Sequence, residues 1–360
     1  MPRVSVILTS YNHAKYIKKS IESVLEQTFD DFELLILDDY SKDDSVQVIT
    51  SFQDSRISLF QSEKPQLVIN GLNRLIHDVA HGEYIAIHHS DDMWTPEKLK
   101  KQVAYLDSNP NIGAVFTHVQ AIDDKGKPIH DQGNIYNRVF QTANRTREEW
   151  LRYFFCEGNC LCHPSILIRK QCYLDCGAYS HGAVSLGDFN MWVRLCLRYP
   201  IHILEEKLTL FRHHSNGSNT SGDNSQFHTL SAVTYFNTMK HYREIATFSE
   251  LCAIFPEACE YDRGKETNLL FALAMLSVNF NPNRASKLFA LEILYELLED
   301  AHTRQNLANV YNFDRNTYSA LICEADPFSR NEVVNLHKEL KKAIDYINTL
   351  ELKLRYKTSP

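Results

Sequence analysis

The first 90 residues alternate short apolar runs with segments whose apolar residues recur at helical spacing. Four runs have the length of buried strands, at residues 4–8, 32–37, 57–60 and 84–87. Ile17, Ile21 and Val24 follow the first run at the spacing of one helix face. This alternation predicts an α/β protein with a mostly parallel sheet and helices on both faces. Sheets of this kind bind ligands at the carboxyl ends of their strands.

The same alternation of apolar runs and segments with helical spacing continues to about residue 215. We expect a further strand at 114–119, a return to the sheet at 162–169 and a helix at 191–198. The intervening stretch 123–147 is rich in Asp, Asn, Gly and Gln, which predicts a mobile loop over the site. Residues 1–215 are therefore expected to form one domain.

The texture changes after residue 215, where Ser, Asn and Gly dominate for about ten positions. We expect a linker at 216–222 and an α-helical domain at 223–360, ending in a helix at 331–356. Apolar residues recur three and four apart along that helix, at Val333, Leu336, Leu340, Ala343, Ile347, Leu350 and Leu354. This spacing is the a/d seam of a coiled coil. The seam packs either on its own domain or on a second copy of the chain, and both readings stay open.

The composition is that of a folded, globular protein. Of its 360 residues 44% are hydrophobic and 23% charged, and the net charge of −7 gives no basic surface for nucleic acid. The longest apolar stretch, at 269–280, falls well short of the roughly 20 residues that a membrane span requires. The opening residues lack the features of a signal peptide, so we expect a cytoplasmic protein.

The nine cysteines have no framework spacing and suit a reducing compartment, where each behaves as a small buried hydrophobe. Cys156, Cys160, Cys162 and His163 form the densest group of zinc-ligand types. Their spacing matches none of the usual zinc patterns, which favours the buried-cysteine interpretation.

Acidic residues follow two of the predicted strands. Asp91 and Asp92 come directly after the strand at 84–87, and hard oxygen ligands at such an open end suit Mg²⁺ or Mn²⁺. The alternative is that they cap a helix beginning near Pro96. Asp39 follows the strand at 32–37, where a carboxylate can accept the N–H of a uracil ring. Turn formation by residues 41–44 explains that segment equally well.

Several longer segments in a fixed order resemble a known enzyme family. They are VSVILTSYNHAKYIKKSIESVLEQTFDDFELLILDDYSKDDS, GEYIAIHHSDDMWTPEKL, GNCLCHPSILIRKQCYLDCGAYS and GDFNMWVRL. Together they resemble the family 2 inverting glycosyltransferases of GT-A fold, over roughly the first 215 residues. The resemblance implies a Rossmann-like GT-A domain that uses a nucleotide-sugar donor.

By this resemblance the strand ends form the donor site. Thr9, Tyr11 and Asp39 would hold the nucleoside, with the tyrosine ring against the base. Asp92 would bind the Mn²⁺ or Mg²⁺ ion that contacts the diphosphate, and Asp91 would reach the ribose or the donor sugar. This chain has Ser-Asp-Asp where many members have Asp-x-Asp.

The later motifs supply the reacting side. Asp188 matches the family's catalytic base, with a helix N-cap as its structural alternative. His214 matches a histidine near the diphosphate, while Asn159, His163 and Ser165 fall where members line the acceptor side. The chemistry requires such a base, because a sugar hydroxyl is a poor nucleophile until a carboxylate takes its proton. A single base opposite the leaving group predicts inversion at the anomeric carbon.

The sequence thus predicts an inverting, metal-dependent transferase that moves a sugar from a UDP- or dTDP-sugar to a glycan acceptor, in bacterial surface polysaccharide synthesis. Acceptors of this kind are often lipid-linked, and residues 330–357 carry 7 basic and 4 acidic side chains. These charges either bring the helix into peripheral contact with the inner membrane face or form a solvated helix surface, and both readings stay open.

Two other functions compete with this prediction. A sugar nucleotidyltransferase would use a similar sheet and metal site, but it requires a glycine-rich phosphate loop, and residues 9–13 contain no glycine. A non-catalytic scaffold assembled through the terminal heptads is the second alternative.

Overall fold

The computed structural model describes residues 1–64, 68–131, 133–215, 225–281 and 283–357. The chain forms two compact units, Met1–Phe255 and Pro256–Pro360. The linker expected at 216–222 lies outside the described residues.

An eight-stranded sheet forms the centre of the first unit, as far as the described residues go. Its strands are β1 (Val4–Ser10), β2 (Phe32–Asp38), β3 (Ile57–Gln61), β4 (Tyr84–His89), β5 (Met93–Trp94), β6 (Ala114–Ile122), β7 (Leu167–Arg169) and β8 (Ile201–Arg212). They are ordered β3-β2-β1-β4-β7-β6-β8-β5. The pairs among β3, β2, β1 and β4 are parallel, as is β6 with β8, whereas β7 and β5 pair antiparallel. The predicted α/β class with a mostly parallel sheet is confirmed.

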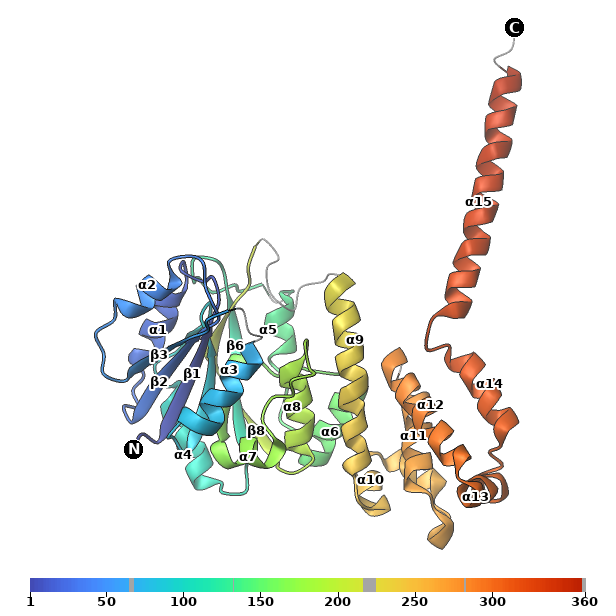
Figure 1. Cartoon of the computed structure of the whole chain (residues 1–360), viewed down its shortest axis with the longest axis horizontal. Coiled ribbons are helices and arrows are strands. Elements are labelled where there is room, and N and C mark those ends of the chain that lie inside the picture. Colours follow the sequence, from blue (N-terminus) through green and yellow to red (C-terminus); the bar gives the residue numbers. More distant parts are fainter. Residues whose placement is uncertain (65–67, 132, 216–224, 282, 358–360) are drawn as a thin grey trace. The chain divides into compact units, whose positions relative to one another are not determined.

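Alternate residues of the central strands face opposite layers, because successive side chains of a strand point to opposite sides. Val6 and Leu8 of β1 belong to a core with Ile21 of α1 (Ile17–Leu25) and Leu99 of α4 (Lys98–Ser108). On the other side, the side chain of Leu37 packs against α3 (Val68–Arg74). Figure 1 shows these helices around the sheet. Three of the four strands predicted in the first 90 residues, β1, β2 and β4, are buried as expected, whereas β3 at the sheet edge is partly exposed.

Further helices complete the first unit around this sheet. They are α2 (Ser45–Thr50), α5 (Ile135–Val139), α6 (Arg147–Cys156), α7 (Lys170–Cys176), α8 (Gly187–Cys196), α9 (Ser225–Met239) and α10 (Phe248–Ile254), together with a π-helix at Leu75–Val79 and 3₁₀ turns at His163–Ser165 and Lys240–Glu244.

Two segments differ from the sequence expectation. The stretch 123–147 is not loop throughout, since it contains α5 and the first residue of α6. Helices α9 and α10 belong to the first compact unit. Tyr235 of α9 and Tyr242 of the 3₁₀ turn after it donate their hydroxyl protons to the backbone carbonyls of Phe155 and Leu151 in α6. The grouping of 223–255 with a separate helical domain thus does not match these contacts, while the functional domain boundaries stay a prediction.

The second unit is helical in the described residues, in agreement with the apolar periodicity. Its helices are α11 (Leu269–Phe280), α12 (Arg284–Glu299), α13 (Ala301–Tyr311), α14 (Arg315–Ala325) and α15 (Arg330–Lys357), after 3₁₀ turns at Pro256–Tyr261 and Gly264–Glu266. Side-chain oxygens of Asn268, Asn283, Asp300 and Asp314 accept N–H groups at the starts of four of these helices. These caps fix where each helix begins.

Helix α15 covers the predicted heptad segment 331–356. Its heptad side chains Leu336, Leu340 and Ile347 are 63%, 58% and 53% exposed in this single chain. The partner of the seam stays a prediction. Among the described residues, no helix is both long enough and apolar enough to cross a membrane.

Gly82 lies just before β4, where the chain passes close to the backbone of β1. A Cβ atom at this position would lie 2.5 Å from the backbone N of Ser5 and 2.8 Å from the carbonyl carbon of Val4. Because both contacts are backbone atoms, we expect Gly82→Ala to lower the free energy of unfolding by about 1–3 kcal/mol. Urea denaturation would measure this. The matched control is Gly182→Ala, where nothing lies within 4 Å of the added atom; equal stabilities of the two variants would contradict the packing described.

Candidate active site

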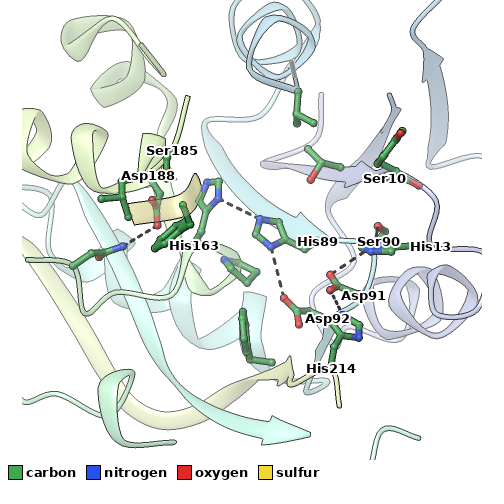
Figure 2. A pocket seen from close by; sticks show the side chains of 18 of the residues that line it. Ser10, His13, His89, Ser90, Asp91, Asp92, His163, Ser185, Asp188 and His214 are labelled. Atoms are coloured by element: carbon green, nitrogen blue, oxygen red, sulfur yellow. Dashed lines mark hydrogen bonds and ion pairs between the residues drawn. The ribbon is translucent and has the colours of Figure 1, made fainter. Parts of the chain in front are cut away.

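A cleft of about 570 Å³ opens at the carboxyl ends of β1 and β4. Residues just after these two strands form one wall, and the start of α8, with the segment before it, forms another. The first wall supplies Thr9, Ser10, Tyr11, His13, His89, Ser90, Asp91 and Asp92, and the second supplies Val184, Ser185, Leu186 and Asp188. Figure 2 shows Asp188 on one side of this cleft and the Asp91–Asp92 pair on the other, with His163 and His89 between them.

Arg212, the last residue of β8, fixes the turn that carries the acidic pair. Its backbone N–H donates to Oδ1 of Asp92 at 2.7 Å, and its Nε donates to the carbonyl of Asp91 at 2.7 Å. Arg212 is 1% exposed, and its guanidinium lies over the ring of Tyr16. Arg212 therefore fixes the position of the turn that carries Asp91 and Asp92, called the acidic turn below.

Asp91 is held by imidazoles. His214 Nε2 lies 2.8 Å from Oδ2 of Asp91, and His13 Nδ1 lies 4.0 Å from its Oδ1. Burial by itself would raise the pKa of Asp91, but the hydrogen bond to His214 and the nearby rings of His13 and His89 outweigh it and lower that pKa to about 2. Asp91 is therefore a carboxylate at neutral pH.

Asp92 is more deeply buried, at 1% exposed. Its Oδ2 has no hydrogen-bond partner among the described residues, and His89 Nδ1 lies 3.8 Å away. Burial and the neighbouring charge of Asp91 raise the pKa of Asp92 well above its usual value. A cation would reverse this effect by favouring the charged form.

The donor atoms of His89, Asp91 and Asp92 lie within 4.8 Å of one another, as do those of His13, Asp91 and His214. Carboxylate oxygen and imidazole nitrogen are ligands that Mn²⁺ accepts, and a buried carboxylate oxygen without a partner is a common mark of an ion site. The residues present therefore fit a divalent cation. Among the described residues, the group Cys156, Cys160, Cys162 and His163 does not form such a cluster.

Asp188 is the second residue of α8. The preceding Leu186 has a left-handed backbone (φ 50°), an unusual conformation for a branched side chain, and it turns the chain so that Asp188 lines the cleft. Asn159 Nδ2 donates to Oδ2 of Asp188 at 2.9 Å. Burial raises the pKa of Asp188, against the lowering effect of the N–H of Phe189 and the amide of Asn159. The N-cap residue of α8 is Leu186, not Asp188.

Most of the site residues predicted from the sequence line this one cleft: Thr9, Tyr11, Asp91, Asp92, Asn159, His163, Asp188 and His214. The helix that follows the acidic pair, α4, has Glu97 at its N-cap, so Asp91 and Asp92 do not cap it.

Two predicted residues are not brought to the cleft lining. Asp39 lies beside it, where its backbone N–H donates to the carbonyl of Ser10 at 2.9 Å. Ser165 is fully buried, and its hydroxyl donates to the carbonyl of Cys162 at 2.7 Å. The structure thus gives Ser165 a part in the local turn and no route to a bound acceptor.

The turn interpretation of residues 41–44 is supported by the contacts after β2. Asp38 accepts the backbone N–H and the hydroxyl of Ser41, and Asp43 accepts from Ser45 and from the backbone of Ala14. These acids hold the loop after β2 against the loop after β1.

Sequence reasoning missed His13 and His89. Both occur inside the motifs quoted above, two positions from the selected residues Tyr11 and Asp91, and His89 is the last residue of β4. Position at the end of a buried strand was the available signal.

The mixed α/β sheet, with an acidic cleft at its strand ends and a carboxylate across from it, agrees with the GT-A fold expected from the sequence. The glycosyl transferase family 2 model matches residues 5–169. An uncharacterized glycosyltransferase of Methanocaldococcus jannaschii is 31% identical over 216 residues, which are 59% of this chain and 71% of that protein. The chain belongs to glycosyltransferase family 2 and is a glycosyltransferase.

Other relatives carry more specific names. The chain is 35% identical over 143 residues to an Escherichia coli protein, UDP-Glc:alpha-D-GlcNAc-diphosphoundecaprenol beta-1,3-glucosyltransferase WfgD, covering 39% of this chain and 56% of that one. Among solved structures, Staphylococcus aureus TarS 1–349 in complex with UDP-GlcNAc gives a TM-score of 0.54 at 15% identity, over 92% of each chain. The mannosyltransferase PcManGT from Pyrobaculum calidifontis, in complex with GDP-Man and Mn²⁺, gives 0.51 at 16% identity, over 91% of this chain and 86% of that one. These two likenesses show the fold.

The hydrogen bond between Asn159 and Asp188 makes a prediction about pH. If Asp188 takes the acceptor's proton, transfer requires its carboxylate form and falls as pH drops through its pKa. Removing the amide in Asn159→Ala takes away an interaction that lowers this pKa, so the acid limb of the pH–rate profile should move to higher pH. Asn279→Ala, which removes an exposed amide of α11, is the control. A limb unmoved, or moved to lower pH, would contradict the role of Asn159.

Proposed function

We propose that this chain is an inverting, metal-dependent glycosyltransferase that moves a sugar from a UDP- or dTDP-sugar to a glycan acceptor in bacterial surface polysaccharide synthesis. One observation carries the proposal, namely that Asp92 and Asp188 line the same cleft. The first has the chemistry of a cation ligand and the second that of a general base. The cleft volume of about 570 Å³ lies in the range of small-molecule binding sites.

In the proposed complex the nucleoside occupies the end of β1. Tyr11 is 50% exposed and lines the cleft beside Thr9, so its ring is available to stack on a base. Asp39 would accept the imide N–H of uracil or thymine from its place beside Ser10. The similar Escherichia coli protein is named for a UDP-Glc donor, and the similar TarS structure is a complex with UDP-GlcNAc; both favour a uridine donor.

The diphosphate would lie over the acidic turn. Asp92 and Asp91 would hold Mn²⁺ or Mg²⁺ there, and His214 would keep Asp91 oriented through its 2.8 Å contact. When bound, the cation stabilises negative charge on the departing nucleoside diphosphate. His13, which also lines the cleft, adds an imidazole to the same region. The Mn²⁺ named with the PcManGT complex is consistent with this assignment.

Asp188 would carry out the proton transfer. Its carboxylate takes the proton of the acceptor hydroxyl while that oxygen forms a bond to the anomeric carbon. The bond from the anomeric carbon to the phosphate oxygen breaks, and its electron pair leaves with the nucleoside diphosphate. Asn159 keeps the carboxylate aimed at the cleft. A single displacement of this kind inverts the anomeric configuration.

The acceptor would enter past an apolar rim. Val184, Leu186, Phe227 and Leu230 line the cleft on the side of Asp188. This rim, and the undecaprenol-linked acceptor in the name of the Escherichia coli relative, favour a lipid-linked glycan. A lipid-linked acceptor would place the reaction in the cytoplasm, with peripheral contact at the inner membrane face.

The heptad side chains of α15 are exposed, and we propose that they join two copies of the chain.

A donor screen tests the proposed function. The chain is incubated with UDP- and dTDP-sugars and Mn²⁺, and the released products are separated. We expect nucleoside diphosphate from at least one donor. Pyrophosphate release from a nucleoside triphosphate would favour the nucleotidyltransferase, and absence of both turnover and metal-dependent nucleotide binding would favour the scaffold.

Asp188→Asn removes the proposed base and keeps the side chain's shape. We expect transfer to fall by at least about 10²-fold, because a positioned base contributes that much. The donor's Kd, measured by calorimetry, should stay close to the original value, since Asp188 lies across the cleft from the acidic turn. Undiminished turnover in this variant would remove Asp188 from the mechanism.

Asp92→Asn tests the cation site through nucleotide binding. In the unmutated chain we expect Mn²⁺ to tighten UDP binding, because a cation held by Asp92 would attract the negatively charged diphosphate. In the variant, calorimetric Kd values with Mn²⁺ and with EDTA should converge. Asp78→Asn changes an exposed acid that does not line the cleft and serves as the control. A metal effect that survives in Asp92→Asn would place the ion elsewhere.

A further inference from the structure

His89 faces the unpaired oxygen of Asp92. Its Nδ1 lies 3.8 Å from Asp92 Oδ2, the buried oxygen that has no hydrogen-bond partner among the described residues. Metal–nitrogen and metal–oxygen bonds are each about 2.0–2.2 Å long, so one ion can reach two atoms at this separation. His89 also lines the cleft, which gives an ion a route to both groups.

The second cluster with metal-ligand spacing is less available. The Nε2 atom of its His214 already lies 2.8 Å from Oδ2 of Asp91, the carboxylate that both clusters share. Its remaining member, His13, has Nδ1 at 2.8 Å from the hydroxyl of Ser90. The unsatisfied ligand atom of the site therefore belongs to the group that contains His89.

A series of hydrogen bonds begins at the Nε2 atom of His89, the ring nitrogen on the side away from Asp92. His89 Nε2 lies 3.2 Å from His163 Nδ1, His163 Nε2 lies 2.7 Å from the hydroxyl of Tyr179, and that hydroxyl lies 2.7 Å from the hydroxyl of Tyr173. The backbone of Tyr179 is fixed in turn by both ends of the Asn73 amide. Figure 2 shows the two imidazoles in line between the acidic pair and the wall of Asp188.

These contacts are compatible with the tautomer that a ligand histidine requires. If Nδ1 of His89 binds an ion, its proton sits on Nε2 and is donated to His163 Nδ1. His163 then carries its proton on Nε2 and donates to Tyr179, whose hydroxyl donates to Tyr173. Each group gives one proton and accepts one, so no donor meets another donor. Ligand histidines in metal sites are commonly oriented by such a partner on the far nitrogen.

We infer that His89 is a third protein ligand of the cation, beside Asp91 and Asp92, and that His163 and Tyr179 are positioning residues for it. The inference rests on the proposed function, because it assigns a ligand to the cation used there. An imidazole nitrogen in the set favours Mn²⁺ over Mg²⁺, which prefers oxygen ligands.

The test measures Mn²⁺ binding without donor or turnover. Free Mn²⁺ is followed by its electron paramagnetic resonance signal during titration of the whole chain. His89→Gln leaves a polar atom near the position of Nε2 and removes the ligand at Nδ1, so we expect Kd to rise by at least about tenfold. Tyr179→Phe removes one hydroxyl from this series of hydrogen bonds and should raise Kd by a similar factor. His77→Gln, an exposed change, should have no effect.

A replacement ligand keeps the inference testable if His89→Gln fails to fold. His89→Asp supplies oxygen in place of nitrogen, so it should retain Mn²⁺ binding and lower the preference for Mn²⁺ over Mg²⁺, measured by Mg²⁺ competition. The role of His89 would be overturned if His89→Asp left the preference for Mn²⁺ over Mg²⁺ unchanged. It would also be overturned if His89→Gln bound Mn²⁺ with the Kd of the unmutated chain.

Asp92→Asn separates this inference from the proposed function. Loss of Mn²⁺ binding in Asp92→Asn with normal binding in His89→Gln would exclude His89 and keep the proposed cation site. Normal binding in both variants would mean that the acidic turn does not hold the ion, and the proposed function would lose its metal.

Discussion

The hydrogen bond from the backbone of Arg212 to one oxygen of Asp92 is the contact on which the site depends. It joins the end of β8 to the turn after β4, and the arginine side chain strengthens the junction by donating to the carbonyl of Asp91. The second oxygen of Asp92 stays buried without a partner among the described residues. An unpaired buried acceptor costs about 1–3 kcal/mol, so a fold that keeps one at a cleft marks a place where a ligand supplies the missing partner.

The fold separates the two kinds of chemistry that sugar transfer requires. The acidic turn follows a strand in the centre of the sheet, whereas Asp188 stands at the start of a helix on the opposite wall. In the proposed reaction the cation therefore acts on the leaving group while the base acts on the acceptor. Between them His89 and His163 form a rigid polar link whose hydrogen bonds continue to two buried tyrosines.

Much of the fold could be predicted because buried strands require continuous apolar runs, and the four runs in the first 90 residues all became strands. β8 was not predicted. Its sequence is interrupted by Glu205, Glu206 and Lys207, and these residues are exposed at a shift in the register with β6, where pairing passes from Leu204 directly to Lys207. A bulge places charged residues outside the ladder and leaves no simple alternation in the sequence.

The site was predictable where it depends on acids in recognisable motifs, as with Asp92 and Asp188. It was not predictable where it depends on which side chains meet in space. Asn159 lines the cleft, but its hydrogen bond to Asp188 could not be foreseen from the sequence, and Ser165 is buried in a turn. His89 gave no periodic signal, because a single histidine at a strand end is compatible with many environments.

The stereochemistry of the first product tests the central claim most directly. With an α-linked nucleotide sugar and water as acceptor, proton NMR can identify the released sugar before its anomers equilibrate. One base acting across the cleft from the leaving group predicts that the β-anomer appears first. Initial release of the α-anomer would contradict a single displacement and with it the arrangement of Asp92 and Asp188 proposed here.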